Sequence, residues 1–140
     1  MKRVIHIAIF ISGAGTNAIN IIEYFKSNNK AKVSLIVSNN PSAGVLDMAK
    51  EFNIPTLVLP SKEMNTDNFI EILHSHNPSL IILAGFLKKI QSKMVAEFPN
   101  RILNVHPALL PKYGGKGMYG MNVHHAIIAA KEPQSGISIH

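Results

Sequence analysis

The sequence has no cysteine among its 140 residues. It therefore has no disulfide framework, no thiol nucleophile and no thiolate ligand for a metal ion. No apolar run reaches the roughly 18 residues that a membrane-spanning helix needs. The apolar stretch 4–11 is not followed by the small-residue cleavage pattern of a signal peptide. These absences fit a cytoplasmic enzyme, and we expect no membrane partner.

Acidic residues are scarce as well: Asp and Glu total 8, against 14 Lys and Arg, so the formal net charge is +6. Such a charge favours anionic partners, which include nucleic acids and phosphate or carboxylate substrates. The basic residues are scattered, however, and no aromatic residues interleave with them as on a platform for single-stranded nucleic acid. We therefore expect a small anionic substrate and no nucleic acid.

Apolar runs alternate with helix-like segments along the chain. We predict strands at 5–11, 32–37, 56–59, 79–84, 101–105 and 136–140, and helices at 17–26, 43–51, 63–76, 91–98 and 122–131. The strand runs are continuously apolar, which is typical of strands covered on both faces in a parallel sheet. Repeated strand–helix units predict one α/β domain over residues 1–140 with a doubly wound, mostly parallel sheet. Ligands bind beyond the carboxyl ends of such strands.

The chain stops on the strand-like segment 136–140, without a turn or a polar tail. A natural domain seldom ends on a strand of buried type, so we expect the domain to be incomplete at its C-terminus. We also expect exposed apolar surface around Ile137 to Ile139, at an unpaired strand edge.

The loop 12–17 (SGAGTN) joins the first predicted strand to the first helix. Its glycines let backbone N–H groups turn toward an anion, and the helix N-terminus adds unpaired donors. Thr16 or Asn17 can cap the helix or bond a phosphate oxygen. With Ala18 the loop also fits the loose dinucleotide pattern G-x-G-x-x-A, but residues 38–40 (SNN) lack the acidic side chain that binds a ribose. A phosphate monoester is therefore favoured over NAD; the alternative is a tight turn without a ligand.

The segment 84–90 (AGFLKKI) follows the fourth predicted strand. Its glycine allows close backbone approach, its phenylalanine and leucine can line an apolar pocket, and Lys88 and Lys89 can hold carboxylates. A core phenylalanine beside solvated lysines is the alternative, and the pattern alone favours it.

Asn104 and His106 end the fifth predicted strand, directly before Pro107. Alternation along a strand puts both side chains on the same side. A carboxamide can stabilise an oxyanion, and an imidazole can move protons near neutral pH. The alternative is a buried, hydrogen-bonded histidine. The long Pro- and Gly-rich loop 106–120 follows, and loops of this length in compact domains are often functional.

The histidines do not suggest a metal site. His124 and His125 are neighbours on a predicted helix and face apart. There is no H-x-x-x-H or H-E-x-x-H pattern and no cysteine. We therefore expect no metal.

Taken together, these segments resemble the folate-dependent phosphoribosylglycinamide formyltransferases of purine synthesis, over essentially the whole chain. Residues 12–17 look like the family's ribonucleotide-phosphate loop, residues 84–90 like its formyl-folate segment, and residues 104–111 (NVHPALLP) like its catalytic signature. The resemblance implies transfer of a formyl group from 10-formyltetrahydrofolate to the amine of glycinamide ribonucleotide. It also implies a formyltransferase-type Rossmann-like domain, acting as a monomer or homodimer.

Residue roles carry over with the resemblance. It implies catalysis by Asn104, which donates a hydrogen bond to the tetrahedral intermediate, and by His106, a general acid or base. Ribonucleotide contacts are implied for Gly15, Thr16 and Asn17. Folate contacts are implied for Lys62, Leu87, Lys88, Lys89, Ile90 and Asn104.

The sequence also departs from the family. Lys88 and Lys89 replace the usual Arg-Ile pair. The family's catalytic aspartate lies beyond the position of His140, so we expect this 140-residue chain to be nearly inactive. The catalytic signature is shared with methionyl-tRNA formyltransferases and formyltetrahydrofolate deformylases. The alternatives are therefore a deformylase, in which water replaces the amine, and an inactive nucleotide-binding α/β fragment.

Overall fold

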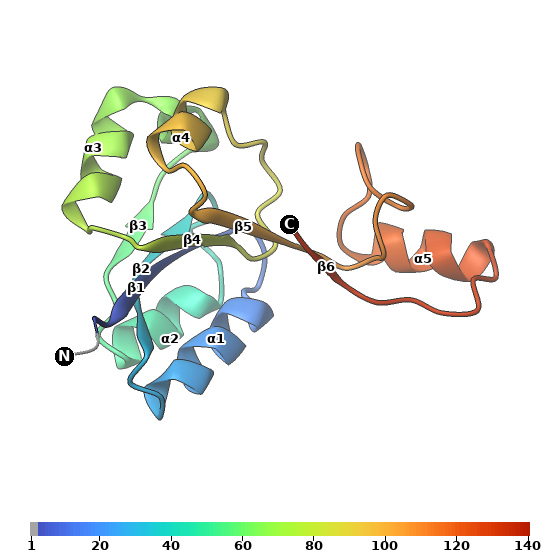
Figure 1. Cartoon of the computed structure of the whole chain (residues 1–140), viewed down its shortest axis with the longest axis horizontal. Coiled ribbons are helices and arrows are strands. Elements are labelled where there is room, and N and C mark those ends of the chain that lie inside the picture. The colour runs from blue at the N-terminus through green and yellow to red at the C-terminus, as the bar shows by residue number, and fades with distance from the viewer. Residues whose placement is uncertain (1–2) are drawn as a thin grey trace.

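The fold is built on one six-stranded sheet, seen in a computed structural model that describes residues 3–140 (Figure 1). The strand order is β3-β2-β1-β4-β5-β6. Strands β1 to β5 pair in parallel, and β6 pairs antiparallel with β5. The strands are β1 (Ile5–Ile11), β2 (Ala31–Ser38), β3 (Thr56–Val58), β4 (Leu80–Leu83), β5 (Ile102–His106) and β6 (Ser138–Ile139). The predicted doubly wound, mostly parallel sheet is confirmed.

Helices cover both faces of this sheet. Helices α1 and α2 lie on one side, and α3 and α4 lie on the other, so both sides of the central strands are removed from water (Figure 1). This double cover explains why the strand sequences are continuously apolar. The helices are α1 (Thr16–Lys26), α2 (Val45–Glu51), the 3₁₀ helix η1 (Ser61–Asn65), α3 (Asp67–Ser75), α4 (Ser92–Glu97) and α5 (Met121–Ala129).

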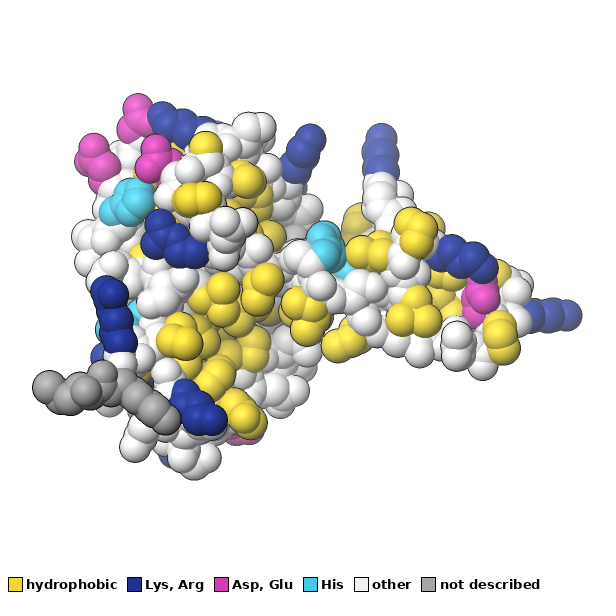
Figure 2. Space-filling model, viewed as in Figure 1, with side chains coloured by type: hydrophobic (Ala, Val, Ile, Leu, Met, Phe, Trp, Pro, Cys, Tyr) yellow, Lys and Arg dark blue, Asp and Glu magenta, His cyan; other side chains and the backbone are white. Residues whose placement is uncertain are grey.

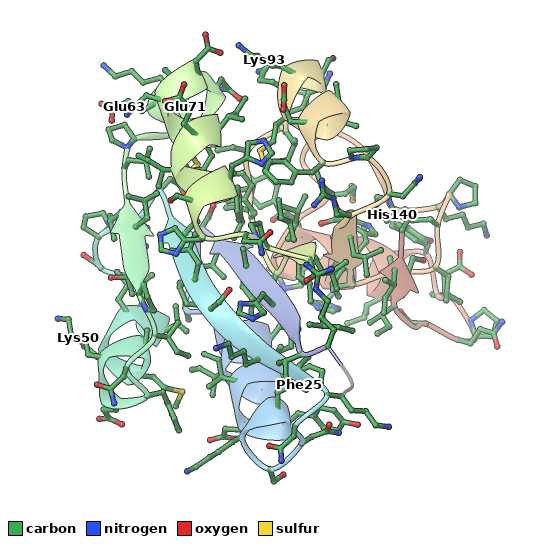
Figure 3. All side chains as sticks on the ribbon, turned by 60° about the vertical axis from the view of Figure 1, so that its left-hand side comes forward. Phe25, Lys50, Glu63, Glu71, Lys93 and His140 are labelled. Carbon is green, nitrogen blue, oxygen red and sulfur yellow. The ribbon has the colours of Figure 1, made fainter. Side chains whose placement is uncertain are left out.

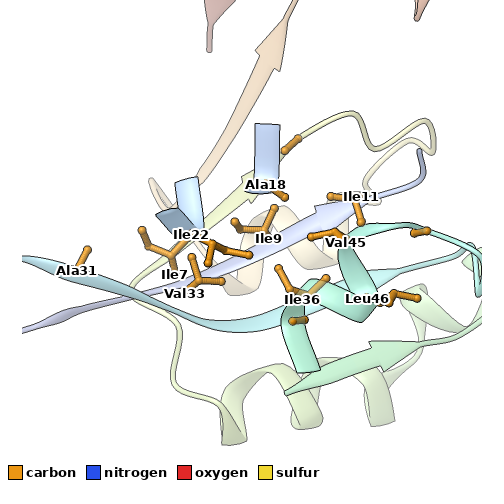
Figure 4. Packing of buried hydrophobic residues seen from close by; sticks show 13 residues of the cluster. Ile7, Ile9, Ile11, Ala18, Ile22, Ala31, Val33, Ile36, Val45 and Leu46 are labelled. Carbon is orange, nitrogen blue, oxygen red and sulfur yellow. The ribbon is translucent and has the colours of Figure 1, made fainter. Parts of the chain in front are cut away.

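Strand β1 divides the core in two, because successive side chains of a strand point to opposite faces. Ile7, Ile9 and Ile11 join the cluster beneath α1 and α2, together with Ala18, Ile22, Val45 and Leu46 (Figure 4). Its even-numbered Ala8 and Phe10 join the cluster beneath α3 and α4. The Phe10 ring meets the rings of Phe69 and Phe86 edge-on, with centroids 6.0 and 5.6 Å away. These contacts hold β1 rigidly at the centre of the sheet.

One predicted helix is two elements in the structure. The segment 63–76, predicted as a single helix, is divided at Thr66, whose backbone is extended (φ −89°, ψ 155°). The Thr66 hydroxyl accepts a hydrogen bond from the Phe69 N–H at 3.3 Å, so it is the N-cap of α3. The prediction of one continuous helix was wrong, because a local threonine cap stabilises a new helix start there.

Strands β5 and β6 extend beyond the helices and carry the loop 107–120 and α5 (Figure 1). A small separate cluster of Ala108, Val123 and Ile127 holds this loop against α5. Ile137, just before β6, and Ile139 within it are 64% and 62% exposed, so this segment presents the apolar surface that was expected. Figure 2 shows hydrophobic side chains gathered in the middle of the face that the view presents. Among residues 3–140, no helix is long and apolar enough to cross a membrane.

Candidate functional site

The order of the strands reverses between β1 and β4, and this position defines the candidate site. In doubly wound sheets the crevice at such a switch point, beyond the carboxyl ends of the strands, binds the ligand. The Ser12 N–H donates to the Gly85 carbonyl at 3.1 Å, and the Leu87 N–H donates to Ser12 Oγ at 3.0 Å. The structure thus brings the predicted phosphate loop directly against the predicted folate segment, although 75 residues separate Ser12 from Leu87.

Gly15 shapes the phosphate-type loop. It is the N-cap of α1, and its φ of +85° lies in the left-handed region that favours glycine. A Cβ on Gly15 would lie 2.7 Å from the Cβ of Val45, so this glycine is also required by packing against α2. Two further bonds hold the loop: Val45 N–H to the Ala14 carbonyl (3.2 Å) and Asn40 Nδ2 to the Ser12 carbonyl (3.1 Å).

Thr16 and Asn17 are exposed in the first turn of α1. Within the described part of the chain, no side chain caps this turn, so the predicted capping role of either residue is not observed. The first N–H groups of the helix are therefore open to an anion, which their partial positive charge favours. Asn39, directly after β2, adds a buried side-chain oxygen that has no hydrogen-bond partner among the described residues. A ligand that donates a hydrogen bond would satisfy it.

A cavity of about 260 Å³ lies beside the segment 84–90. Lys62 of η1 lines it together with Lys88, Lys89 and Ile90, so the structure groups four of the predicted folate residues from two distant segments. None of the described side chains that line it is acidic, which suits a ligand with carboxylates. The full lining is Ser61, Lys62, Met64, Asn65, Phe86, Lys88, Lys89, Ile90 and Gln91. Leu87 is not part of this lining; its side chain is exposed.

Asn104 has a partner that the sequence did not reveal. Its backbone exchanges two hydrogen bonds with His140, at 2.7 and 3.0 Å, where β6 pairs with β5. Its side-chain Nδ2 also donates to His140 Nε2 at 2.9 Å. A carboxamide nitrogen has two N–H donors, so one remains for a ligand. Figure 3 shows His140 toward the edge of the sheet opposite to Lys50 of α2.

His106 is half-buried at the end of β5. Its Nε2 lies 2.7 Å from the backbone oxygen of Tyr113. A carbonyl can only accept, so Nε2 carries the proton of this hydrogen bond. In the neutral ring, Nδ1 is then the atom that can accept a proton. Asn104 and His106 both lie in β5, two positions apart, which is the spacing that puts two side chains on one side of a strand.

Tyr113 is itself anchored by Glu132, a residue that sequence reasoning missed. The Tyr113 hydroxyl donates to Glu132 Oε1 at 2.8 Å, and Lys112 Nζ donates to the same oxygen at 3.0 Å. The hydrogen bonds from Tyr113 and then Lys112 lower the pKa of the Glu132 carboxyl. The same hydrogen bonds to Glu132 raise the pKa of Tyr113 and of Lys112.

A larger cavity of about 490 Å³ lies at the amino-terminal edge of the sheet, between the ends of α1 and α2. Phe25 and Phe52 line it, with Lys26 over the Phe52 ring at 4.9 Å. It contains none of the predicted site residues. In the described residues, no three His, Asp or Glu side chains gather in a way that could hold a metal ion.

The sheet has a glycine loop at its switch point and an asparagine and a histidine at the end of a nearby strand, so the chain is an α/β protein of the doubly wound class with polar groups at the carboxyl ends of its strands. The comparison with known families is more specific. The chain belongs to the formyl transferase family, whose pattern matches residues 5–140.

Relatives with similar sequences carry a common name. A chloroplastic phosphoribosylglycinamide formyltransferase of Arabidopsis thaliana is 38% identical, over 96% of this chain and 48% of its own length. The phosphoribosylglycinamide formyltransferase of Haemophilus influenzae is 36% identical, over 96% of this chain and 64% of its own length. The chain thus spans about half the length of the plant relatives that it matches.

Solved structures of phosphoribosylglycinamide formyltransferases have a similar fold. The phosphoribosylglycinamide formyltransferase of Coxiella burnetii, in complex with CHES, superimposes with a TM-score of 0.86 at 32% identity, over 99% of this chain and 65% of that one. A formyltetrahydrofolate deformylase of Pseudomonas syringae has a TM-score of 0.83 at 14% identity, which shows a shared fold alone.

Proposed function

We propose that the whole protein transfers a formyl group from 10-formyltetrahydrofolate to the amine of glycinamide ribonucleotide. The observation that carries the proposal is the glycine loop at the switch point, which is bonded through Ser12 to the segment 84–90. A ribonucleotide needs such a phosphate site, whereas a deformylase, which uses water, does not. The named relatives at 31–38% identity support the same activity.

The phosphate of the ribonucleotide would bind at Gly15, Thr16 and Asn17. The uncapped first turn of α1 offers backbone N–H groups, and the exposed hydroxyl and carboxamide can add hydrogen bonds. This arrangement holds the substrate by its phosphate and leaves the amine free to extend across the switch point. Such positioning of two substrates supplies much of the rate of a group transfer.

The folate would lie on the other side of the crevice. Its glutamate carboxylates would meet Lys62, Lys88 and Lys89 around the 260 Å³ cavity, while Leu87 and Ile90 add apolar contact. Asn104 would contact the formyl end. No metal is part of this proposal.

The chemistry needs one bond made, one bond broken and one proton moved. The amine nitrogen attacks the formyl carbon, and the free N–H of Asn104 donates to the oxygen of the tetrahedral intermediate. His106 Nδ1 accepts a proton from the attacking amine and returns it toward the departing folate nitrogen, N10. The carbon–N10 bond then breaks, and the formyl group remains on the ribonucleotide amine.

The test is to follow loss of the formyl-folate by the whole protein with and without glycinamide ribonucleotide, and to identify formylated ribonucleotide among the products. We expect consumption only when the ribonucleotide is present. Equal consumption without ribonucleotide would support a deformylase. No consumption, combined with no ribonucleotide binding in calorimetry, would leave a folded α/β domain without this activity.

The cytoplasm remains our proposed location, on the basis of the sequence composition. The plant relatives have "chloroplastic" in their names, so location differs within the family.

A further inference from the structure

We propose that Glu132 is a positioning residue for His106 and acts on it through Tyr113. Glu132 lies after α5, 26 positions beyond His106 in the sequence, and its side chain accepts hydrogen bonds from Lys112 and Tyr113, which lie outside the phosphate loop and the folate segment. The catalytic consequence of this proposal rests on the proposed function; the structural connection does not.

Tyr113 makes two short hydrogen bonds, one through its side-chain hydroxyl and one through its backbone carbonyl. The hydroxyl donates to Glu132 Oε1 at 2.8 Å, and the backbone carbonyl accepts from His106 Nε2 at 2.7 Å. The side chain of Tyr113 also packs on the cluster of Ala108, Val123 and Ile127. The ring is therefore held at its tip and along its body, and the carbonyl that faces His106 is fixed with it.

The backbone of Tyr113 makes this anchor necessary. Its φ is +58°, a left-handed conformation that is unfavourable for a bulky residue and persists only when the surroundings hold it. The residues on its C-terminal side are Gly114 and Gly115, which offer little resistance to a change of backbone. Without the bond to Glu132, Tyr113 is free to leave this conformation, and its carbonyl then turns away from Nε2.

The bond to the carbonyl has a chemical result. It keeps the proton of the neutral imidazole on Nε2 and leaves Nδ1 as the acceptor, so it selects one tautomer and one ring orientation. Through Tyr113, Glu132 therefore influences which ring nitrogen of His106 takes a proton. A residue with a merely structural role would change stability but would not change the tautomer.

The central variants are Tyr113→Phe, which removes only the hydroxyl, and Glu132→Ala, which removes the acceptor. Glu132→Gln is the conservative variant, because its amide oxygen still accepts from the hydroxyl. Tyr119→Phe is the matched control: it removes the same hydroxyl from an exposed tyrosine of the same loop.

The first measurement is the ¹⁵N NMR spectrum of the His106 ring at a pH where the ring is neutral, assigned among the seven histidines by comparison with His106→Gln. We expect the proton on Nε2 in the wild type, in Glu132→Gln and in Tyr119→Phe. In Tyr113→Phe and Glu132→Ala we expect a mixture of both tautomers. This measurement needs no substrate, so it decides the connection even where formyl transfer, and with it the proposed function, fails.

The second measurement is formyl transfer. We expect kcat to fall roughly tenfold in Tyr113→Phe and Glu132→Ala with KM for the ribonucleotide nearly unchanged, less than the roughly 10²-fold cost of a misplacement of about 1 Å. The double variant Tyr113→Phe/Glu132→Ala should lose no more of kcat than either single variant. The proposal is overturned if the two central variants show the wild-type tautomer, or if the tautomer changes equally in Tyr119→Phe.

Discussion

The N–H of Leu87 donates a hydrogen bond to the side-chain oxygen of Ser12, and the N–H of Ser12 donates to the carbonyl of Gly85. This pair of bonds joins the loop after β1 to the loop after β4 at the point where the strand order reverses. Ser12 is buried, so the Leu87 N–H has little access to water as a substitute partner. The two proposed substrate sites therefore share one support.

We predict that Ser12→Ala weakens binding of both the ribonucleotide and the formyl-folate. The substitution leaves the Leu87 N–H without its partner, which costs roughly 1–3 kcal/mol for a buried donor. Calorimetric titration of each ligand measures the effect, and Ser42→Ala, an exposed serine in a nearby loop, is the control. If only one ligand binds more weakly, the two loops do not depend on each other.

Substitutions at Gly13 and Gly15 should separate binding from folding. A Cβ on Gly13 meets no atom within 4 Å, so Gly13→Val extends into the open space in front of the loop. We expect at least roughly tenfold weaker ribonucleotide binding, about 1.4 kcal/mol, with an almost unchanged melting temperature. Gly15→Val collides with Val45 and holds a β-branched residue at positive φ, so it should lower stability by at least roughly 1–3 kcal/mol. Calorimetry and thermal unfolding distinguish the two; unaltered binding in Gly13→Val would place the phosphate elsewhere.

The lysines around the 260 Å³ cavity should contribute to binding of the folate rather than of the ribonucleotide. We predict that the double variant Lys88→Ala/Lys89→Ala weakens binding of a polyglutamated folate on the order of tenfold, because charge-assisted hydrogen bonds to carboxylates are lost. Ribonucleotide affinity should change much less. Lys30→Ala/Lys32→Ala removes the same charge at the opposite edge of the sheet and controls for net charge. The reverse ranking of the two ligands would exchange the proposed sites.

The sequence alone allowed the sheet to be predicted, because a strand covered by helices on both faces is continuously apolar, as Leu80 to Leu83 are. The pair Asn104 and His106 was also predictable, since alternation in a strand is local. The contact of Asn104 with His140 was not, because it depends on antiparallel pairing across 36 residues. The anchor of Tyr113 on Glu132 depends on a left-handed residue in a glycine-rich loop, and no local pattern predicts that conformation.

The anchor at Glu132 should depend on pH in a defined direction. The pKa of Glu132 is lowered in the folded protein, so its bonds stabilise the loop above the unfolded pKa of the carboxyl and are lost as pH falls through the folded pKa. The pKa values of Tyr113 and Lys112 are raised in the folded protein. The stability that these two groups contribute is therefore complete below their unfolded pKa values and is lost as pH rises through their folded pKa values. Thermal unfolding of wild type and Glu132→Ala across pH should therefore differ near neutrality and converge in acid and in strong base. A difference that persists in acid would mean that packing, not the ionised carboxylate, holds the loop.

The last prediction concerns the two residues at the end of β5. Asn104→Ala removes the N–H proposed for the oxyanion, and His106→Ala removes the proton acceptor Nδ1, so each should lower kcat for formyl transfer by roughly 10²-fold or more. His140→Ala should cost less. It removes only the acceptor for the other N–H of Asn104, so the carboxamide loses its fixed orientation but keeps its donors. Ribonucleotide affinity, measured by calorimetry, should stay near the wild-type value in all three, because the phosphate loop lies after a different strand. Equal loss in His140→Ala and Asn104→Ala would mean that the orientation of the amide, rather than the presence of its donor, is what catalysis requires. Unchanged kcat in Asn104→Ala or His106→Ala would remove that residue from the mechanism.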